Sequence, residues 1–158
     1  MQSPCPPAIL APVQRPDTER VVREVWEAFE RDGIAAVLMR AADDARWHPH
    51  SAHGRHFEST PDYARFVAES ATSGERVEAQ LLGVWVHGDV GVTRGRMRVR
   101  RRGAIVEDTR MYWAFRVGGG KVTLMASSPD LAAILREAGL PDASLRNAAF
   151  LALHRDAA

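Results

Sequence analysis

The spacing of hydrophobic residues changes once along the chain, close to residue 75. Before that point, apolar residues recur every three or four positions, which is typical of helices that bury one face. This spacing predicts helices over residues 18–32, 34–39 and 60–72. After that point, the spacing becomes strand-like and predicts four long strands, over residues 75–87, 90–100, 104–117 and 121–128.

Shorter elements fill the remaining segments. Residues 45–48 are predicted to form a short strand, with a turn at Asp43-Asp44 before it and Pro49 after it. Residues 49–59 are predicted to be a histidine-rich loop, and residues 131–138 a short helix. Proline-rich residues 1–17 indicate a flexible leader, and residues 139–158 a C-terminal helical extension or tail. One domain is therefore expected over residues 18–138.

Helices that come first and strands that follow indicate an α+β layer fold. The loops between the long strands are too short for crossovers, so these strands are expected to be antiparallel. Gly83, Gly91 and Gly95 lie inside the strands and allow them to bend. The expected architecture is a curved antiparallel sheet with the N-terminal helices on its concave side, enclosing a cone-shaped pocket.

Three parts of the chain resemble the SnoaL-like, or nuclear transport factor 2-like, superfamily. They are residues 21–49 (VVREVWEAFERDGIAAVLMRAADDARWHP), residues 54–68 (GRHFESTPDYARFVA), and the paired strands LLGVWVHGDVGVTRGRMRV and YWAFRVGGGKVTLMAS. The resemblance covers about residues 18–135 and implies a cystatin-like α+β roll. It also implies a choice of activities, because the superfamily includes polyketide cyclases, ketosteroid isomerase, scytalone dehydratase, limonene epoxide hydrolase and proteins without chemistry.

The charge balance limits the partners that are expected for this chain. The net charge is +1, which predicts no strong attraction to nucleic acid or to anionic lipid. There is one cysteine, and no apolar run approaches the ~20 residues that span a bilayer, so a cytoplasmic location is expected. Arginines alternate at Arg94, Arg96, Arg98 and Arg100, which predicts a solvated or subunit-facing sheet surface with Glu107 and Asp108 opposite it. The resemblance implies a homodimer through the outer sheet face.

The resemblance also singles out His48. Ketosteroid isomerase-like relatives have a proton-shuttling carboxylate at this place, and a histidine can move protons near neutral pH. The same relatives have a tyrosine and an acid where this chain has Val25 and Trp113. Neither of these side chains has the hydroxyl or carboxylic acid proton with which those relatives stabilise an oxyanion.

The loop histidines have the spacing H-x-H-x2-H-x2-H over His48, His50, His53 and His56. Clustered imidazoles can bind zinc. A histidine-rich surface loop without cysteine is the alternative, and a pair of histidines acting as acid and base is another. We assign no metal and no cofactor from the sequence.

Two functions are compatible with these observations. The first is a cyclase, isomerase or dehydratase that acts on a small apolar carbonyl compound with His48 as general base. The second is a non-catalytic module of the same fold for ligand binding or dimerisation. In both cases the expected pocket residues are Trp47, His50, His53, Tyr63, Phe29, Met111, Trp113 and Phe115.

Overall fold

The computed structural model describes residues 17–141, and three helices lead into the sheet. They are α1 (Thr18–Asp32), α2 (Ile34–Leu38) and α3 (Thr60–Thr72). The side chain of Asp17 caps α1 by accepting from the amide of Arg20, and that of Ser59 caps α3 in the same way. Gly33 ends α1 with φ 76°, a conformation that glycine adopts without strain. These signals explain why the predicted helix ends are accurate.

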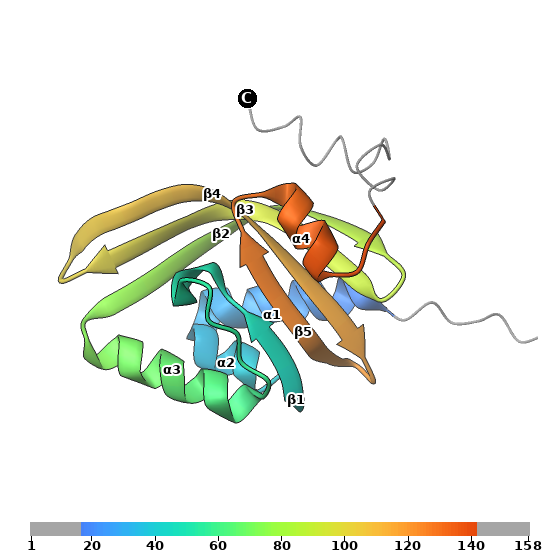
Figure 1. Ribbon diagram of the computed structural model, residues 1–158, viewed down its shortest axis with the longest axis horizontal. Helices are drawn as coiled ribbons and strands as arrows, with labels where there is room; N and C mark the ends of the chain where they lie inside the picture. The colour runs from blue at the N-terminus through green and yellow to red at the C-terminus, as the bar shows by residue number, and fades with distance from the viewer. Residues whose placement is uncertain (1–16, 142–158) are drawn as a thin grey trace, which may run out of the picture.

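The sheet has five strands in the order β1-β5-β4-β3-β2. They are β1 (Ala41–His48), β2 (Glu75–His87), β3 (Val90–Arg101), β4 (Ala104–Gly118) and β5 (Lys121–Ser128). The four long strands pair antiparallel, as expected from their short connections. Strand β1 pairs parallel to β5 at the edge of the sheet. The sheet is curved and does not close (Figure 1).

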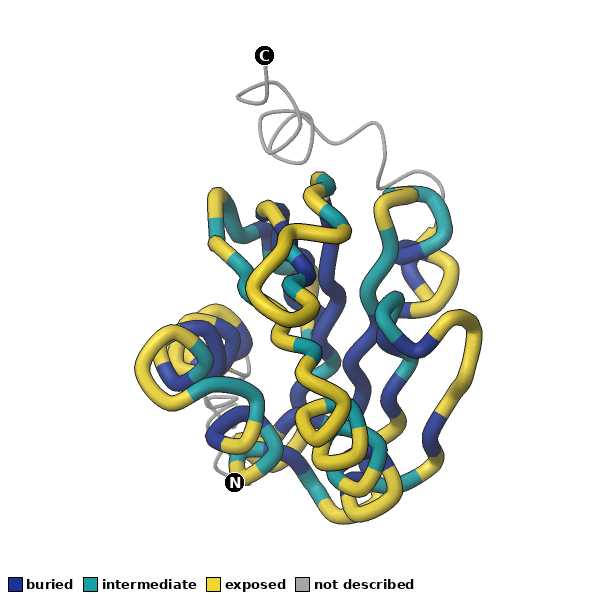
Figure 2. Tube along the Cα trace, turned by 90° about the vertical axis from the view of Figure 1, so that its left-hand side faces the viewer, coloured by how far each residue is buried: buried dark blue, intermediate teal, exposed yellow. Residues whose placement is uncertain are grey.

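Helices cover both faces of the sheet (Figure 1). Helices α1, α2 and α3 lie on one face, where the main core includes Val22, Trp47 and Met111. The short helix α4 (Leu131–Glu137) lies on the other face and packs Ile134 and Leu135 against a second cluster. Buried residues follow the strands and the inner sides of the helices (Figure 2). We call the α1–α3 side the inner face and the α4 side the outer face.

Two sequence-based expectations differ from the structure. Asp43 and Asp44 do not form a turn but lie within β1, which begins at Ala41 rather than at residue 45. Both aspartates are exposed, in the part of this edge strand where the register with β5 is irregular, so water solvates their carboxylates. The helices do not all lie on one face, because α4 covers the outer one. The leader and the C-terminal tail fall outside the described residues, apart from Asp17 and residues 139–141.

No helix within residues 17–141 is long and apolar enough to cross a lipid bilayer.

The arginine stripe of β3 is not uniformly solvated. Arg96 and Arg98 both pair with Asp108 on β4, as the sequence suggested, and the hydrogen bond from Arg96 lowers the pKa of that carboxyl. Arg94 instead is only 3% exposed. Its Nε and Nη1 atoms have no hydrogen-bond partner among residues 17–141. The expected homodimer contact through this face remains a prediction.

Replacing Arg94 with methionine should stabilise the fold. A buried charge with two unpaired nitrogen atoms is costly, and an apolar side chain of similar length removes that cost. We expect Arg94→Met to raise the free energy of unfolding by about 1–3 kcal/mol, measured by urea denaturation. The control Arg96→Met, at an exposed and paired site, should change it by less than ~1 kcal/mol. A loss of stability in Arg94→Met would show that the charge has a favourable partner.

Candidate functional site

A cavity of about 710 Å³ lies between the inner face of the sheet and helices α1–α3. Most of its lining is apolar, and aromatic rings are prominent. The rings come from α1, β1, α3 and β4: Trp26, Phe29, Trp47, Tyr63, Phe66, Trp113 and Phe115. Such lining is typical of sites for small organic molecules.

The rings of the cavity wall contact one another edge-on and face-on. Trp26 and Trp113 meet nearly perpendicular, with centroids 4.8 Å apart. Trp47 stacks on Tyr63 at 4.7 Å with an interplanar angle of 25°. These contacts join α1 to β4 and β1 to α3, so the wall is held by elements that are far apart in sequence.

Charged residues of the cavity lining come from the end of α1 and the start of β2. They are exposed or half-buried and form a rim: Glu30, Arg31, Asp32, Glu75, Arg76 and Glu78. Several are already paired, since Glu75 contacts Arg101 and Glu78 contacts Arg100. The rim therefore carries both signs of charge and favours neither an anion nor a cation.

Tyr63 supplies one polar group to the cavity wall. Its side chain is buried, and burial raises the pKa of its phenol well above the ordinary value. The hydroxyl consequently keeps its proton at neutral pH and can donate a hydrogen bond. Tyr63 is among the lining residues of the cavity, so the phenol is a donor at the cavity wall.

Trp26 supplies a second donor. The residue is 5% exposed, and its indole N–H is buried without a partner in the described part of the chain. An unpaired buried donor costs roughly 1–3 kcal/mol. Trp47 contrasts with it, because its indole N–H donates to the hydroxyl of Thr60 at 3.1 Å.

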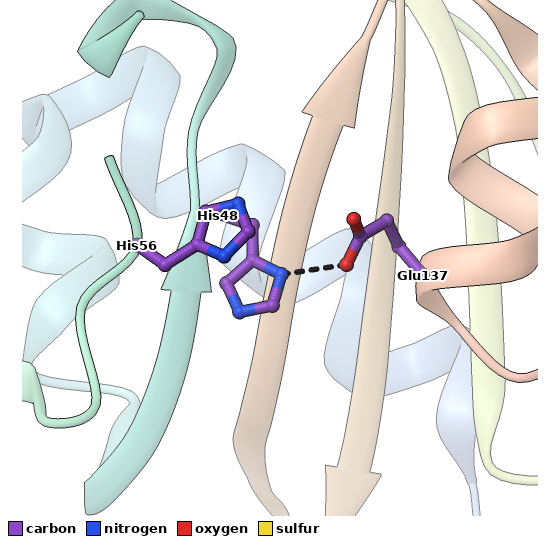
Figure 3. Close-up of side chains that lie close together, drawn as sticks. All are labelled: His48, His56 and Glu137. Carbon is purple, nitrogen blue, oxygen red and sulfur yellow. Dashed lines mark hydrogen bonds and ion pairs between the residues drawn. The ribbon is translucent and has the colours of Figure 1, made fainter. Parts of the chain in front are cut away.

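His48, the general base expected from the sequence, does not line the cavity. It pairs with Ala126 of β5, whose side chain belongs to the outer cluster under α4. Its Nδ1 lies 2.7 Å from Oε2 of Glu137, the last residue of α4 (Figure 3). Adjacent residues of a strand face opposite sides, so the inward side chain of Trp47 turns His48 outward. His48 therefore has no direct access to a molecule in the cavity.

His50 and His53 also lie outside the lining. His50 begins the short 3-10 helix η1 (His50–Ala52), and its Nε2 lies 3.2 Å from Oε1 of Glu107. Its backbone N–H donates to Oγ of Ser127, which does line the cavity. His53 is exposed and follows η1 with a positive φ of 51°. Of these two histidines, only His50 borders one end of the cavity.

Of the other expected pocket residues, all but one line the cavity. Phe29, Trp47, Tyr63, Trp113 and Phe115 are in the lining, whereas Met111 is fully buried in the core beside it. Sequence reasoning missed Met97, Met125 and Ser127 as lining residues. The alternation of β3 already placed Met97 opposite the arginines, but Met125 and Ser127 face inward because of their register with Phe115 and Trp113.

No model of a known protein family matches the sequence, and no curated protein is detectably similar to it in sequence. Solved structures do match. A nuclear transport factor 2-like protein of unknown function from Burkholderia pseudomallei has a TM-score of 0.61 and 22% identity, and the match covers 77% of this chain and 96% of that one. An epoxide hydrolase of the LEH-like type from M. tuberculosis has a TM-score of 0.60 and 14% identity, with 77% and 84% covered.

A third match is a protein described as a SnoaL-like polyketide cyclase, from Jannaschia. It has a TM-score of 0.56 and 21% identity, and the match covers 84% of this chain and 97% of that one. At these identities the similarity concerns the fold, and the same fold carries different activities.

Proposed function

This chain has the nuclear transport factor 2-like fold, and from that premise we propose that it binds a small, largely apolar molecule in the cavity of the inner face. The observation that carries the proposal is the aromatic lining of a cavity of about 710 Å³. Its size lies within the range of ~300–1,000 Å³ that is usual for small-molecule sites. The names of two similar structures, an epoxide hydrolase and a polyketide cyclase-like protein, also describe small organic substrates.

The polar groups of the wall narrow the ligand class. The indole N–H of Trp26 is a donor without a partner in residues 17–141, and the phenol of Tyr63 is a second donor in the lining. The paired rim residues add no excess charge of either sign. A ligand with flat rings and one or two acceptor oxygens would stack on the aromatic wall and satisfy these donors. An aromatic ketone or quinone-like compound has this chemistry.

Binding is better supported than catalysis by His48. A general base must reach the proton that it removes, either directly or through one water. His48 faces the outer side of the sheet and is bonded to Glu137. No histidine is among the lining residues of the cavity in the described chain.

A second candidate function rests on His50. Its imidazole is paired with Glu107, and the residue borders the end of the cavity where Ser51 and Ser127 lie. A carboxylate beside an imidazole orients the ring. Acid–base catalysis on a bound carbonyl compound would then use His50 rather than His48. In that case His50→Gln should abolish conversion of the compound, as judged by mass spectrometry of the product. The affinity of the variant for the compound should stay unchanged.

A bulky side chain that fills the cavity should weaken the binding of small molecules. Ala79 of β2 lines the cavity, and its neighbour Gln80 is exposed. We expect Ala79→Phe to weaken the binding of the fluorescent probe anilinonaphthalene sulfonate by at least about tenfold, which is ~1.4 kcal/mol. The matched control Gln80→Phe adds the same ring on the opposite face of the same strand and should leave binding unchanged. Equal affinity in both variants would contradict the proposal.

A further inference from the structure

Three side chains that can bind a metal converge on the outer face of the sheet (Figure 3). His48 ends β1, His56 lies in the loop before α3, and Glu137 ends α4. One nitrogen or oxygen atom from each lies within 4.8 Å of the other two. The sequence spacing suggests a metal site made of the four loop histidines. In the structure only His48 and His56 belong to the cluster, and its third member is the carboxylate of Glu137, far along the chain.

Backbone contacts hold the two histidines together. Trp47 and Phe57 exchange two backbone hydrogen bonds of 2.9 Å, which fold the loop back along the end of β1. Their neighbours His48 and His56 consequently stack, with ring centroids 3.9 Å apart and an angle of 10° between the planes. This arrangement does not depend on a long flexible side chain.

Glu137 is brought to the histidines by the packing of α4. Ile134 and Leu135 are buried against the outer cluster and fix the helix on the sheet. Asp130 caps the start of the helix by accepting from the amide of Ala132. The carboxylate of Glu137 then lies 2.7 Å from Nδ1 of His48, although the two residues are 89 positions apart.

We propose that His48, His56 and Glu137 form a binding site for a divalent transition-metal ion, with Zn²⁺ as the best-suited ion. Two imidazoles and one carboxylate are a common three-ligand set for zinc, in which water occupies the fourth position. A neutral imidazole offers one nitrogen lone pair, and the carboxylate supplies a negative charge that compensates the cation. Mg²⁺ and Ca²⁺ prefer sites made of oxygen atoms and are poorly matched here.

To reach a metal-bound geometry, the ring of His56 has to turn off its stack on His48, because two nearly parallel rings do not point their nitrogen atoms at one ion. In a tetrahedral site with bonds of about 2.0–2.1 Å, neighbouring ligand atoms lie roughly 3.3 Å apart. The contact of 2.7 Å between His48 and Glu137 would open slightly as the metal comes between the two side chains. His56 and Glu137 are exposed, so their side chains can rotate without disturbing the core.

Such a metal would tie together β1, the histidine loop and α4. Helix α4 packs mainly on β4 and β5, and the pair formed by His48 and Glu137 joins it to β1. A metal that binds only the folded chain stabilises that chain in proportion to its concentration. This site lies on the opposite face from the cavity, so the inference does not rest on the proposed ligand-binding function.

Titration of the untagged, full-length chain with Zn²⁺ tests the proposal. We expect one equivalent to bind, measured by competition with a chromophoric chelator, and the thermal unfolding midpoint to rise. His56→Ala and Glu137→Gln should each weaken Zn²⁺ binding by at least about tenfold, since even residues that merely support ligands cost 10–100-fold. Co²⁺ should give visible absorption bands in the wild-type chain that both variants lose.

The matched control is His53→Asn, an exposed histidine of the same loop. Asparagine tolerates the positive φ of that position, so the substitution is mild. The control should bind Zn²⁺ with wild-type affinity. Zn²⁺ binding that is unchanged in His56→Ala and Glu137→Gln, or equally weakened in His53→Asn, would overturn the proposal. Absence of one-to-one binding in the wild-type chain would also overturn it. Both substituted residues are exposed, and far-UV circular dichroism of the metal-free variants verifies that they fold.

Discussion

The substitution Gly95→Ala adds a single methyl group and should strongly destabilise this protein. A Cβ atom at Gly95 would lie 2.0 Å from the backbone carbonyl oxygen of Gln80 and 3.0 Å from the ring of Trp113. The first contact is with the backbone of the neighbouring strand, which cannot rotate away. Strand β2 would have to move, next to the register shift between Leu81 and Gly83. We expect a loss of at least ~3 kcal/mol, the upper end of the usual cost of overpacking.

Urea denaturation of Gly95→Ala and of a matched glycine variant measures this effect. Gly118→Ala is the control, because an added Cβ there meets only the side chain of Thr123, at 3.3 Å. The control should lose less than ~1 kcal/mol. Since a domain has only about 5–15 kcal/mol of stability, we expect Gly95→Ala to be recovered in poor yield. A Gly95→Ala variant as stable as the control would show that the strands are further apart than described.

Trp47→Ala is expected to give the second large effect. The side chain is completely buried, stacks on Tyr63, and donates a hydrogen bond to Thr60. Its removal loses apolar burial and leaves empty space beside an existing cavity. We expect the free energy of unfolding to fall by about 3–5 kcal/mol, the range for truncating buried aromatic residues.

Trp47→Phe separates the two contributions of that side chain. Phenylalanine keeps a ring against Tyr63 but loses the hydrogen bond to Thr60, whose hydroxyl still donates to the carbonyl of Ala42 at 2.6 Å. We expect a smaller loss, of about 1–2 kcal/mol, in the same denaturation experiment. A loss below ~1 kcal/mol for Trp47→Ala would indicate that the core collapses into the space and that the aromatic wall is not rigid.

The alternation of β1 separates two kinds of chemistry. Trp47 faces the cavity on the inner side, and the next residue, His48, faces Glu137 on the outer side. The proposed small-molecule site and the proposed metal site therefore use opposite faces of one strand. The two proposals can fail independently, because Ala79→Phe changes the inner face and His56→Ala changes the outer one.

Strand alternation could already have corrected one expectation from sequence. Trp47 and His48 were both expected at the pocket, but consecutive residues of a strand cannot face the same side. The aromatic residue has more apolar surface to bury, so it is the one that turns inward. Strand alternation does not apply to His50, because this residue lies in η1, after the strand has ended.

Local sequence determined the helices, the long hairpins and most of their ends, because those depend on neighbouring residues. Examples are the cap at Ser59, the turn at Gly33 and the period change at Glu75. Only the tertiary structure decided which distant segments meet. It pairs β1 parallel to β5, buries Arg94 within a stripe of arginines that are otherwise more exposed, and brings Glu137 to His48. The physical reason is that such contacts depend on the register and packing of whole elements, whereas periodicity and capping depend on hydrogen bonds within a few residues.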